Sequence, residues 1–114
     1  MGKKCSKHRQ IIDNLEQRIK DKGYATIIAK EYVHRTGECD LIVKIFNNLF
    51  IYEVKCNYNN KTLYKGKKQL LRDTKYLYVR TGLKCYGVLY SPNWGFKSIA
   101  KNGKRLHNTQ TGYD

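Results

Sequence analysis

Apolar residues recur every three or four positions in two segments of this chain, and the spacing predicts two amphipathic helices. In the first segment Ile12, Leu15 and Ile19 stand among polar residues, and a basic, glycine-ended stretch follows them. The second segment has the same spacing and also ends at a glycine. We therefore expect helices over about residues 6–22 and 63–80.

Shorter apolar runs, rich in β-branched and aromatic residues, lie between these helices and predict strands. One run covers residues 24–35. Two more cover 40–46 and 49–56, and Asn47 and Asn48 stand between them. Asparagine tolerates the backbone geometry of tight turns, so this pair of runs predicts a β-hairpin.

After the second helix, residues 84–90 form a largely apolar run that predicts another strand. A last hairpin is expected from residue 96 to about 106, with its turn at Asn102 and Gly103. The predicted order is α-β-β-β-α-β followed by this hairpin. We expect an α/β (α+β) fold in which a central mixed sheet is flanked by the two helices.

The length of 114 residues fits a single domain, residues 1–114, in which about 108–114 form a flexible tail. Lysine and arginine together number 23 and acidic residues 9, which gives a formal charge of +14. Such an excess indicates an anionic partner, most commonly nucleic acid. No apolar run is long enough to span a membrane, and no secretory signal is evident, so we expect an intracellular protein.

Charged residues interrupt the apolar strands of the central hairpin at one end. Glu53 and Lys55 project from the same face of their strand, because strand side chains alternate. Asp40 opens the partner strand. Equal counting from a turn at Asn47 and Asn48 pairs Asp40 with Lys55 and places Glu53 one same-face step further in. The three side chains are therefore expected to converge.

Two neighbouring carboxylates repel each other unless a cation lies between them. Mg²⁺ (or Mn²⁺) accepts carboxylate oxygens and shares its remaining positions with water and substrate phosphate. The main-chain carbonyl of Val54 is a further candidate ligand. The ammonium of Lys55 is well placed to orient the attacking water or to neutralise charge on the phosphate.

These residues resemble the PD-(D/E)xK phosphodiesterases, a superfamily of restriction endonucleases, Holliday-junction resolvases and repair nucleases. The match is Asp40 followed by Glu53, Val54 and Lys55, with Cys39 where the family often has proline. Residues 37–42 and 50–55 (GECDLI and FIYEVK) also resemble a bacterial group within it whose signature is GEIDLI followed by FVEVK. Chain size and an N-terminal helical glutamate are similar to archaeal and viral Holliday-junction resolvases. The resemblance covers about residues 8–90.

The resemblance implies a restriction-endonuclease-like fold and a metal-dependent DNA endonuclease, structure-selective like a Holliday-junction resolvase and acting as a homodimer in DNA recombination or repair. Asp40 and Glu53 would be metal ligands and Lys55 the catalytic lysine. Glu16 matches an acid on the first helix that helps to hold the metal. Gln69 matches a polar residue near the scissile phosphate.

Several alternatives stay open at this point. Glu16 is also spaced for a surface ion pair with Lys20, and Glu38 is the rival additional acid. A noncatalytic basic module that binds nucleic acid is the alternative to a nuclease, and RNA is not excluded as the substrate. The candidate nucleic-acid contacts around the second helix are Lys61, Lys65, Lys67, Lys68, Arg72 and Lys75.

Further basic, aromatic and sulfur-containing residues complete the set of candidates. Lys97, Lys101, Lys104 and Arg105 form a second basic group, and Tyr58, Tyr64, Tyr76, Tyr78 and Trp94 are candidates for base stacking. The four cysteines form no CxxC pair, so we expect reduced packing residues. His8, His34 and His107 lack the spacing of a metal site and are expected to be ordinary surface or strand histidines.

Overall fold

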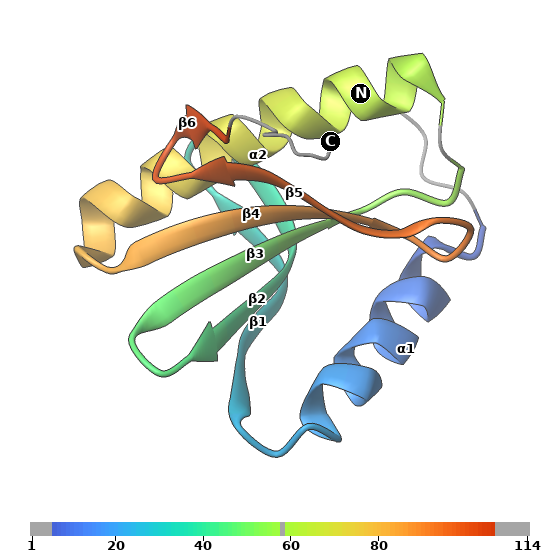
Figure 1. Cartoon of the computed structure of the whole chain (residues 1–114), viewed down its shortest axis with the longest axis horizontal. Helices are drawn as coiled ribbons and strands as arrows, with labels where there is room; N and C mark the ends of the chain where they lie inside the picture. Colours follow the sequence, from blue (N-terminus) through green and yellow to red (C-terminus); the bar gives the residue numbers. More distant parts are fainter. Residues whose placement is uncertain (1–5, 58, 107–114) are drawn as a thin grey trace.

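The chain folds around one mixed sheet in this computed structural model, whose described residues are 6–57 and 59–106. Figure 1 shows two helices on opposite sides of the sheet. The predicted order of elements and the final hairpin are confirmed, whereas the predicted tail and Tyr58 lie outside the described residues. The elements are α1 (His8–Lys20), β1 (Ala25–His34), β2 (Gly37–Ile45), β3 (Asn48–Val54), α2 (Asn60–Thr81), β4 (Lys84–Ser91), β5 (Gly95–Lys101) and β6 (Lys104–Arg105).

The strands lie in the sheet in the same order as in the sequence, from β1 to β6. Neighbours are antiparallel except β3 and β4, which are parallel and are joined by α2. A parallel connection requires a crossover, because both strands begin at the same end of the sheet and the chain must return to that end before the second strand starts. The helix α2 is that crossover, and it lies directly against the strands that it connects.

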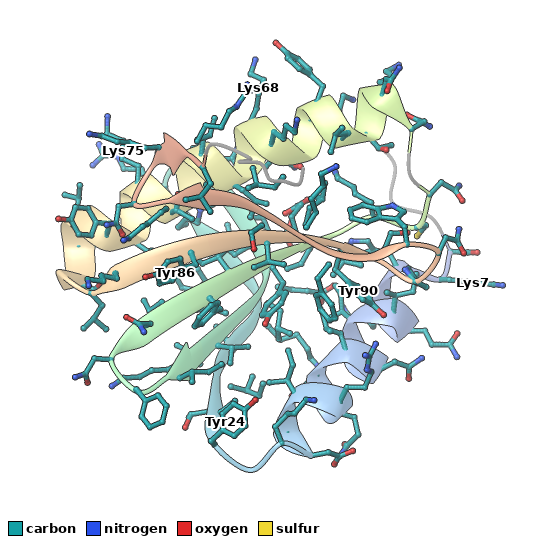
Figure 2. The ribbon with its side chains drawn as sticks, in the orientation of Figure 1. Lys7, Tyr24, Lys68, Lys75, Tyr86 and Tyr90 are labelled. Carbon is teal, nitrogen blue, oxygen red and sulfur yellow. The ribbon has the colours of Figure 1, made fainter. Side chains whose placement is uncertain are left out.

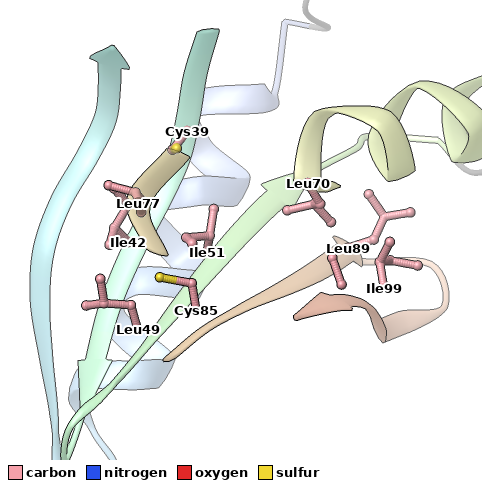
Figure 3. Packing of buried hydrophobic residues seen from close by; sticks show 10 residues of the cluster. Cys39, Ile42, Leu49, Ile51, Leu70, Leu77, Cys85, Leu89 and Ile99 are labelled. Atoms are coloured by element: carbon pink, nitrogen blue, oxygen red, sulfur yellow. The ribbon is translucent and has the colours of Figure 1, made fainter. Parts of the chain in front are cut away.

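Each helix buries its apolar stripe on its own face of the sheet. Ile12, Leu15 and Ile19 of α1 pack in a cluster that includes Tyr52 and Val54 of β3. On the other face, the cluster in Figure 3 joins α2 to β2, β3, β4 and β5. Its members are Cys39, Ile42, Leu49, Ile51, Leu70, Leu77, Cys85, Leu89, Ile99 and Ala100. No helix within the described ranges has both the length and the apolar character that crossing a membrane demands.

The second helix begins three residues earlier than the apolar spacing predicts, at Asn60. The reason is a capping box: the Asn59 side chain accepts from the Thr62 N–H, and the Thr62 hydroxyl accepts from the Asn59 N–H, each at 3.0 Å. Gly82 ends the helix in the left-handed conformation, with φ of 73°. Hydrogen bonds at its first turn therefore extend α2 into the polar residues that precede the apolar spacing.

The turn between β2 and β3 differs from the prediction by one residue. Phe46 and Asn47 form it, with Phe46 at φ 55°, and Asn48 already pairs with Ile45. The resulting register is shifted by two residues from the one counted around Asn47 and Asn48. A two-residue shift returns every side chain to its original face, so hydrophobic alternation does not distinguish the two registers.

This correction changes which charged residues meet at the open end of the hairpin. The last ladder pair is Leu41 with Tyr52. One further step places Glu53, rather than Lys55, opposite Asp40. The predicted direct pairing of Asp40 with Lys55 is therefore wrong, and the two carboxylates are the neighbours.

Candidate active site

Asp40, within β2, and Glu53, near the end of β3, come together away from solvent. The strand β2 begins at Gly37, so the expectation that Asp40 opens it is wrong. Asp40 is 3% exposed and Glu53 is 5% exposed. The carboxylate Oδ2 of Asp40 accepts a hydrogen bond from the main-chain N–H of Val54 at 2.8 Å. This bond holds the Asp40 side chain between the two strands, close to the main-chain carbonyl of Val54.

Lys55 links this carboxylate pair to α2. Its Nζ lies 3.4 Å from Glu53 Oε2 and donates a hydrogen bond to Gln69 Oε1 at 3.0 Å. The main-chain N–H of Lys55 donates to the Tyr90 carbonyl at 2.8 Å, which extends the β3–β4 pairing. Asp40, Glu53, Lys55 and Gln69 are thus in one site, as the sequence interpretation expected of them.

His8 joins the same site, and the sequence analysis missed it. Its Nε2 lies 3.2 Å from the Val54 carbonyl oxygen and 3.4 Å from Asp40 Oδ2, and its side chain is 9% exposed. The expectation that His8 is an ordinary surface residue is wrong. A signal existed in the sequence, because His8 precedes Ile12 by four residues and continues the buried stripe of α1.

Glu16 lies elsewhere on α1. Its carboxylate accepts from Lys30 at 2.9 Å and pairs with Lys20 at 3.2 Å, and both lysines lower its pKa. Eight residues separate Glu16 from His8, which is about 12 Å along a helix axis. The structure therefore brings His8, rather than Glu16, from α1 to the carboxylates. Glu38, the rival acid, is half-buried on β2 and pairs with Val33 of β1 across the ladder.

The site strongly disfavours negative charge in the absence of a cation. Burial, followed by repulsion from Asp40, raises the pKa of Glu53 from 4.5 to about 8, although Lys55 acts in the opposite direction. A divalent cation between the two carboxylates would reverse this effect. The donor set of two carboxylates and the Val54 carbonyl suits Mg²⁺ or Mn²⁺, and the imidazole of His8 suits Mn²⁺ better than Mg²⁺.

The basic residues of α2 are distributed over more than one side of the helix. Lys68 and Lys75 project outward from α2 in Figure 2. Lys67 is directed toward β5 and β6, where burial and the nearby charges of Arg105 and Lys97 lower its pKa. The two basic groups predicted from the sequence therefore meet along one surface. It contains Lys67, Lys68, Lys75, Lys97, Lys104 and Arg105, and we refer to it as the basic surface. Lys101 is not part of it, because its Nζ lies over the ring of Tyr86, which stacks on Phe50 on the face that α1 covers.

The remaining predicted contact residues lie at other positions around α2. Lys61 and Lys65 are exposed near the start of the helix. Arg72 is half-buried beside Gly37 and donates through Nε to Asp73 at 3.0 Å. Arg72 is thus already engaged within the protein.

Of the aromatic candidates, two are available to solvent on α2. Tyr64 is 61% exposed and Tyr78 is 41% exposed. Tyr76 stacks on the ring of His34 with 4.3 Å between centroids, so it serves internal packing. Trp94 is half-buried and packs against the core beneath α2.

The cysteines and the other histidines also depart in part from expectation. Cys39 and Cys85 are free and buried, as predicted, but Cys56 is disulfide-bonded. His34 is the last residue of β1, as the strand alternative of the prediction has it. Its side chain is fully buried rather than at the surface, and its Nε2 lies 2.8 Å from Asp73 Oδ1. His107 lies outside the described residues.

Neither a model of a known protein family nor a curated protein sequence matches this chain. The candidate function therefore depends on the site itself and on the surface around it.

Proposed function

We propose that this protein is a metal-dependent DNA endonuclease that hydrolyses backbone phosphodiester bonds. The observation that carries the proposal is the convergence of two buried carboxylates and one ammonium group, from Asp40, Glu53 and Lys55, at the end of a single hairpin. Burying two like charges side by side destabilises the folded protein, so such a pair indicates that a function requires it. Carboxylates with perturbed pKa values are concentrated at catalytic sites.

Each side chain has a role that follows from its position. Asp40, Glu53 and the Val54 carbonyl would hold Mg²⁺ or Mn²⁺, with His8 as an additional ligand from α1. The bound ion would activate a water molecule and neutralise charge on the phosphate. Lys55 is 18% exposed at its side chain and is held by Gln69. Its ammonium can therefore contact both the buried acids and a phosphate at the surface.

The surface of the molecule favours a nucleic-acid substrate. The basic surface defined above offers several lysines that can contact phosphates, and exposed Tyr64 and Tyr78 can stack on unpaired bases. We propose selectivity for DNA structure, as in a Holliday-junction resolvase, because contacts from lysines to phosphates position a protein on DNA without reading the base sequence. Paired cuts across a junction would require a homodimer.

The proposal includes a restriction-endonuclease-like classification of the fold. Its support is the helix that precedes the catalytic hairpin, the placement of Glu53 and Lys55 on β3, and the crossover helix α2 that carries Gln69. In this arrangement the two helices approach the site from opposite faces of the sheet.

Cleavage assays test the proposal directly. Purified protein is incubated with a four-way junction, a linear duplex, a single strand and RNA, each with Mg²⁺, Mn²⁺ or a chelator. We expect metal-dependent cutting of the junction and its loss in Asp40→Asn and Glu53→Gln. Asp13→Asn is the matched control, because Asp13 is a partly exposed acid that pairs only with Lys30 among the described contacts. Cutting by Asp40→Asn or Glu53→Gln at the parental rate would refute the proposed roles.

A noncatalytic nucleic-acid-binding module is the second candidate, and one observation favours it. Asp40 accepts from Val54 and faces His8, while Glu53 pairs with Lys55, so these groups already satisfy one another as a buried polar network. This candidate predicts salt-sensitive DNA binding with no metal-dependent product on any of the four substrates. The same assay therefore separates the two functions.

A further inference from the structure

Three side chains with metal-binding atoms meet at a second place, between β1, β2 and α2. They are His34 at the end of β1, Cys39 in β2 and Asp73 in α2. One ligand atom from each lies within 4.8 Å of the other two. The side chains of His34 and Asp73 are fully buried, and Cys39 is completely inaccessible.

One atom of this cluster has no partner. Asp73 Oδ1 accepts hydrogen bonds from His34 Nε2 at 2.8 Å and from Arg72 Nε at 3.0 Å. The other carboxylate oxygen, Oδ2, is buried and has no hydrogen-bond partner among the described residues. Buried carboxylate oxygens are normally satisfied, so an unpartnered oxygen beside a thiol and an imidazole indicates a missing ligand.

The donor types identify the class of ligand. We propose that His34, Cys39 and Asp73 form a Zn²⁺ site that holds β1, β2 and α2 together. Zinc binds sulfur, imidazole nitrogen and carboxylate oxygen, whereas Mg²⁺ avoids thiolate. Tetrahedral zinc separates neighbouring N and O ligands by about 3.3 Å. The Nε2 to Oδ1 contact is shorter than this, and a small rotation of Asp73 would present the unpartnered Oδ2 in its place.

Zinc binding requires a change of tautomer in His34 and the loss of the thiol proton of Cys39. The N–H of Thr36 donates to Nδ1 of His34 at 3.1 Å, so the neutral ring carries its proton on Nε2. When zinc binds Nε2, the ring changes tautomer: Nε2 loses its proton and Nδ1 gains one. Nδ1 then donates to the Thr36 hydroxyl, also at 3.1 Å, and the hydrogen bond from the Thr36 N–H to Nδ1 is lost. Cys39 releases its thiol proton to solvent as the zinc–sulfur bond forms. The net reaction releases one proton for each ion bound.

The site is independent of the proposed nuclease activity, although Cys39 directly precedes Asp40. A metal held at this position would fix the start of β2 against α2. The wide sequence spacing of the three ligands gives no metal-binding motif. The fold alone brings them together.

Cobalt substitution tests the site in the full chain, prepared under argon without added reductant so that the disulfide of Cys56 stays intact and Cys39 stays a free thiol. Co²⁺ bound to a thiolate gives a charge-transfer absorption in the near ultraviolet, which carboxylate and imidazole ligands do not give. We expect this band in the parent and in Cys85→Ser, the control for a free buried cysteine elsewhere in the same core, and its loss in Cys39→Ser. Absence of the band from the parent, or its persistence in Cys39→Ser, overturns the proposal.

Zinc titration provides a second readout that also separates the site from the active site. We expect Asp73→Asn, which preserves side-chain shape, to weaken Zn²⁺ binding at least about 10-fold. Asp40→Asn should retain the cobalt–thiolate band and the zinc-induced rise in melting temperature, roughly 10 °C at a 100-fold excess over Kd. The proposal fails if Asp40→Asn abolishes that rise while Asp73→Asn keeps it, because the metal would then belong to the carboxylate pair.

Discussion

The buried acid Glu53 should make the stability of this protein fall as the pH rises. Its pKa is raised from 4.5 to about 8 by burial and by Asp40. Between these pH values the folded chain keeps a proton that the unfolded chain has lost, so increasing pH favours unfolding. At about 1.4 kcal/mol per pH unit the full effect is roughly 5 kcal/mol. Relaxation of water and of the Lys55 ammonium around the carboxylate reduces it, and we expect about 2 kcal/mol.

Urea unfolding from pH 5 to pH 8 in chelator measures this effect as the difference between the parent and Glu53→Gln. The amide cannot ionise, so the variant should lose the decline and exceed the parent in stability at pH 8 by about 2 kcal/mol. Glu16→Gln is the control, because ion pairs lower the pKa of Glu16 and its ionisation is complete below this range. Parallel stability profiles for the parent and Glu53→Gln would refute the reasoning. Added Mn²⁺ should make the stability of the parent rise with pH instead of falling, and should not have this effect on the variant.

Three further predictions address the site, the core and the surface. His8→Asn should lower the single-turnover rate of Mn²⁺-dependent cleavage at least about 10-fold, and an unchanged rate would exclude the imidazole from the metal site. Gly87→Ala should destabilise the chain by about 1–3 kcal/mol in urea unfolding, because the added Cβ would lie 3.0 Å from Leu70 Cβ; a more stable variant would contradict this packing. Lys68→Ala should reduce the slope of log K against log salt for duplex DNA by about 0.9, and an unchanged slope would show that Lys68 contacts no phosphate.

Local patterns in the sequence predict most of the fold. Helix spacing locates α1 and α2, and asparagine and glycine locate the final turn, where Asn102 has φ of 53°. The turn between β2 and β3 could not be placed by the same means. Hydrophobic alternation leaves a two-residue ambiguity in the register, and Phe46 is not a residue that normally marks a left-handed backbone position.

The candidate site residues that lie on one hairpin were predictable from the sequence. Those that the helices bring in through tertiary packing were less so. Asp40, Glu53 and Lys55 interrupt apolar strands, which made them conspicuous. His8 reaches the site only because α1 lies across β3, and Asp73 meets His34 only because α2 crosses back over the sheet. Both continue the buried stripe of their own helix. A polar residue at a core position is the signal by which they could have been found.

The parallel pairing of β3 with β4 has a consequence for synthesis of the chain. The main chain of Lys55 is anchored to Tyr90, which the ribosome adds 35 residues later. While β4 is still inside the exit tunnel, a nascent polypeptide already contains Asp40, Glu53 and Lys55 but lacks the strand that holds the last of them. The geometry that we associate with cleavage therefore arises only after most of the chain has emerged.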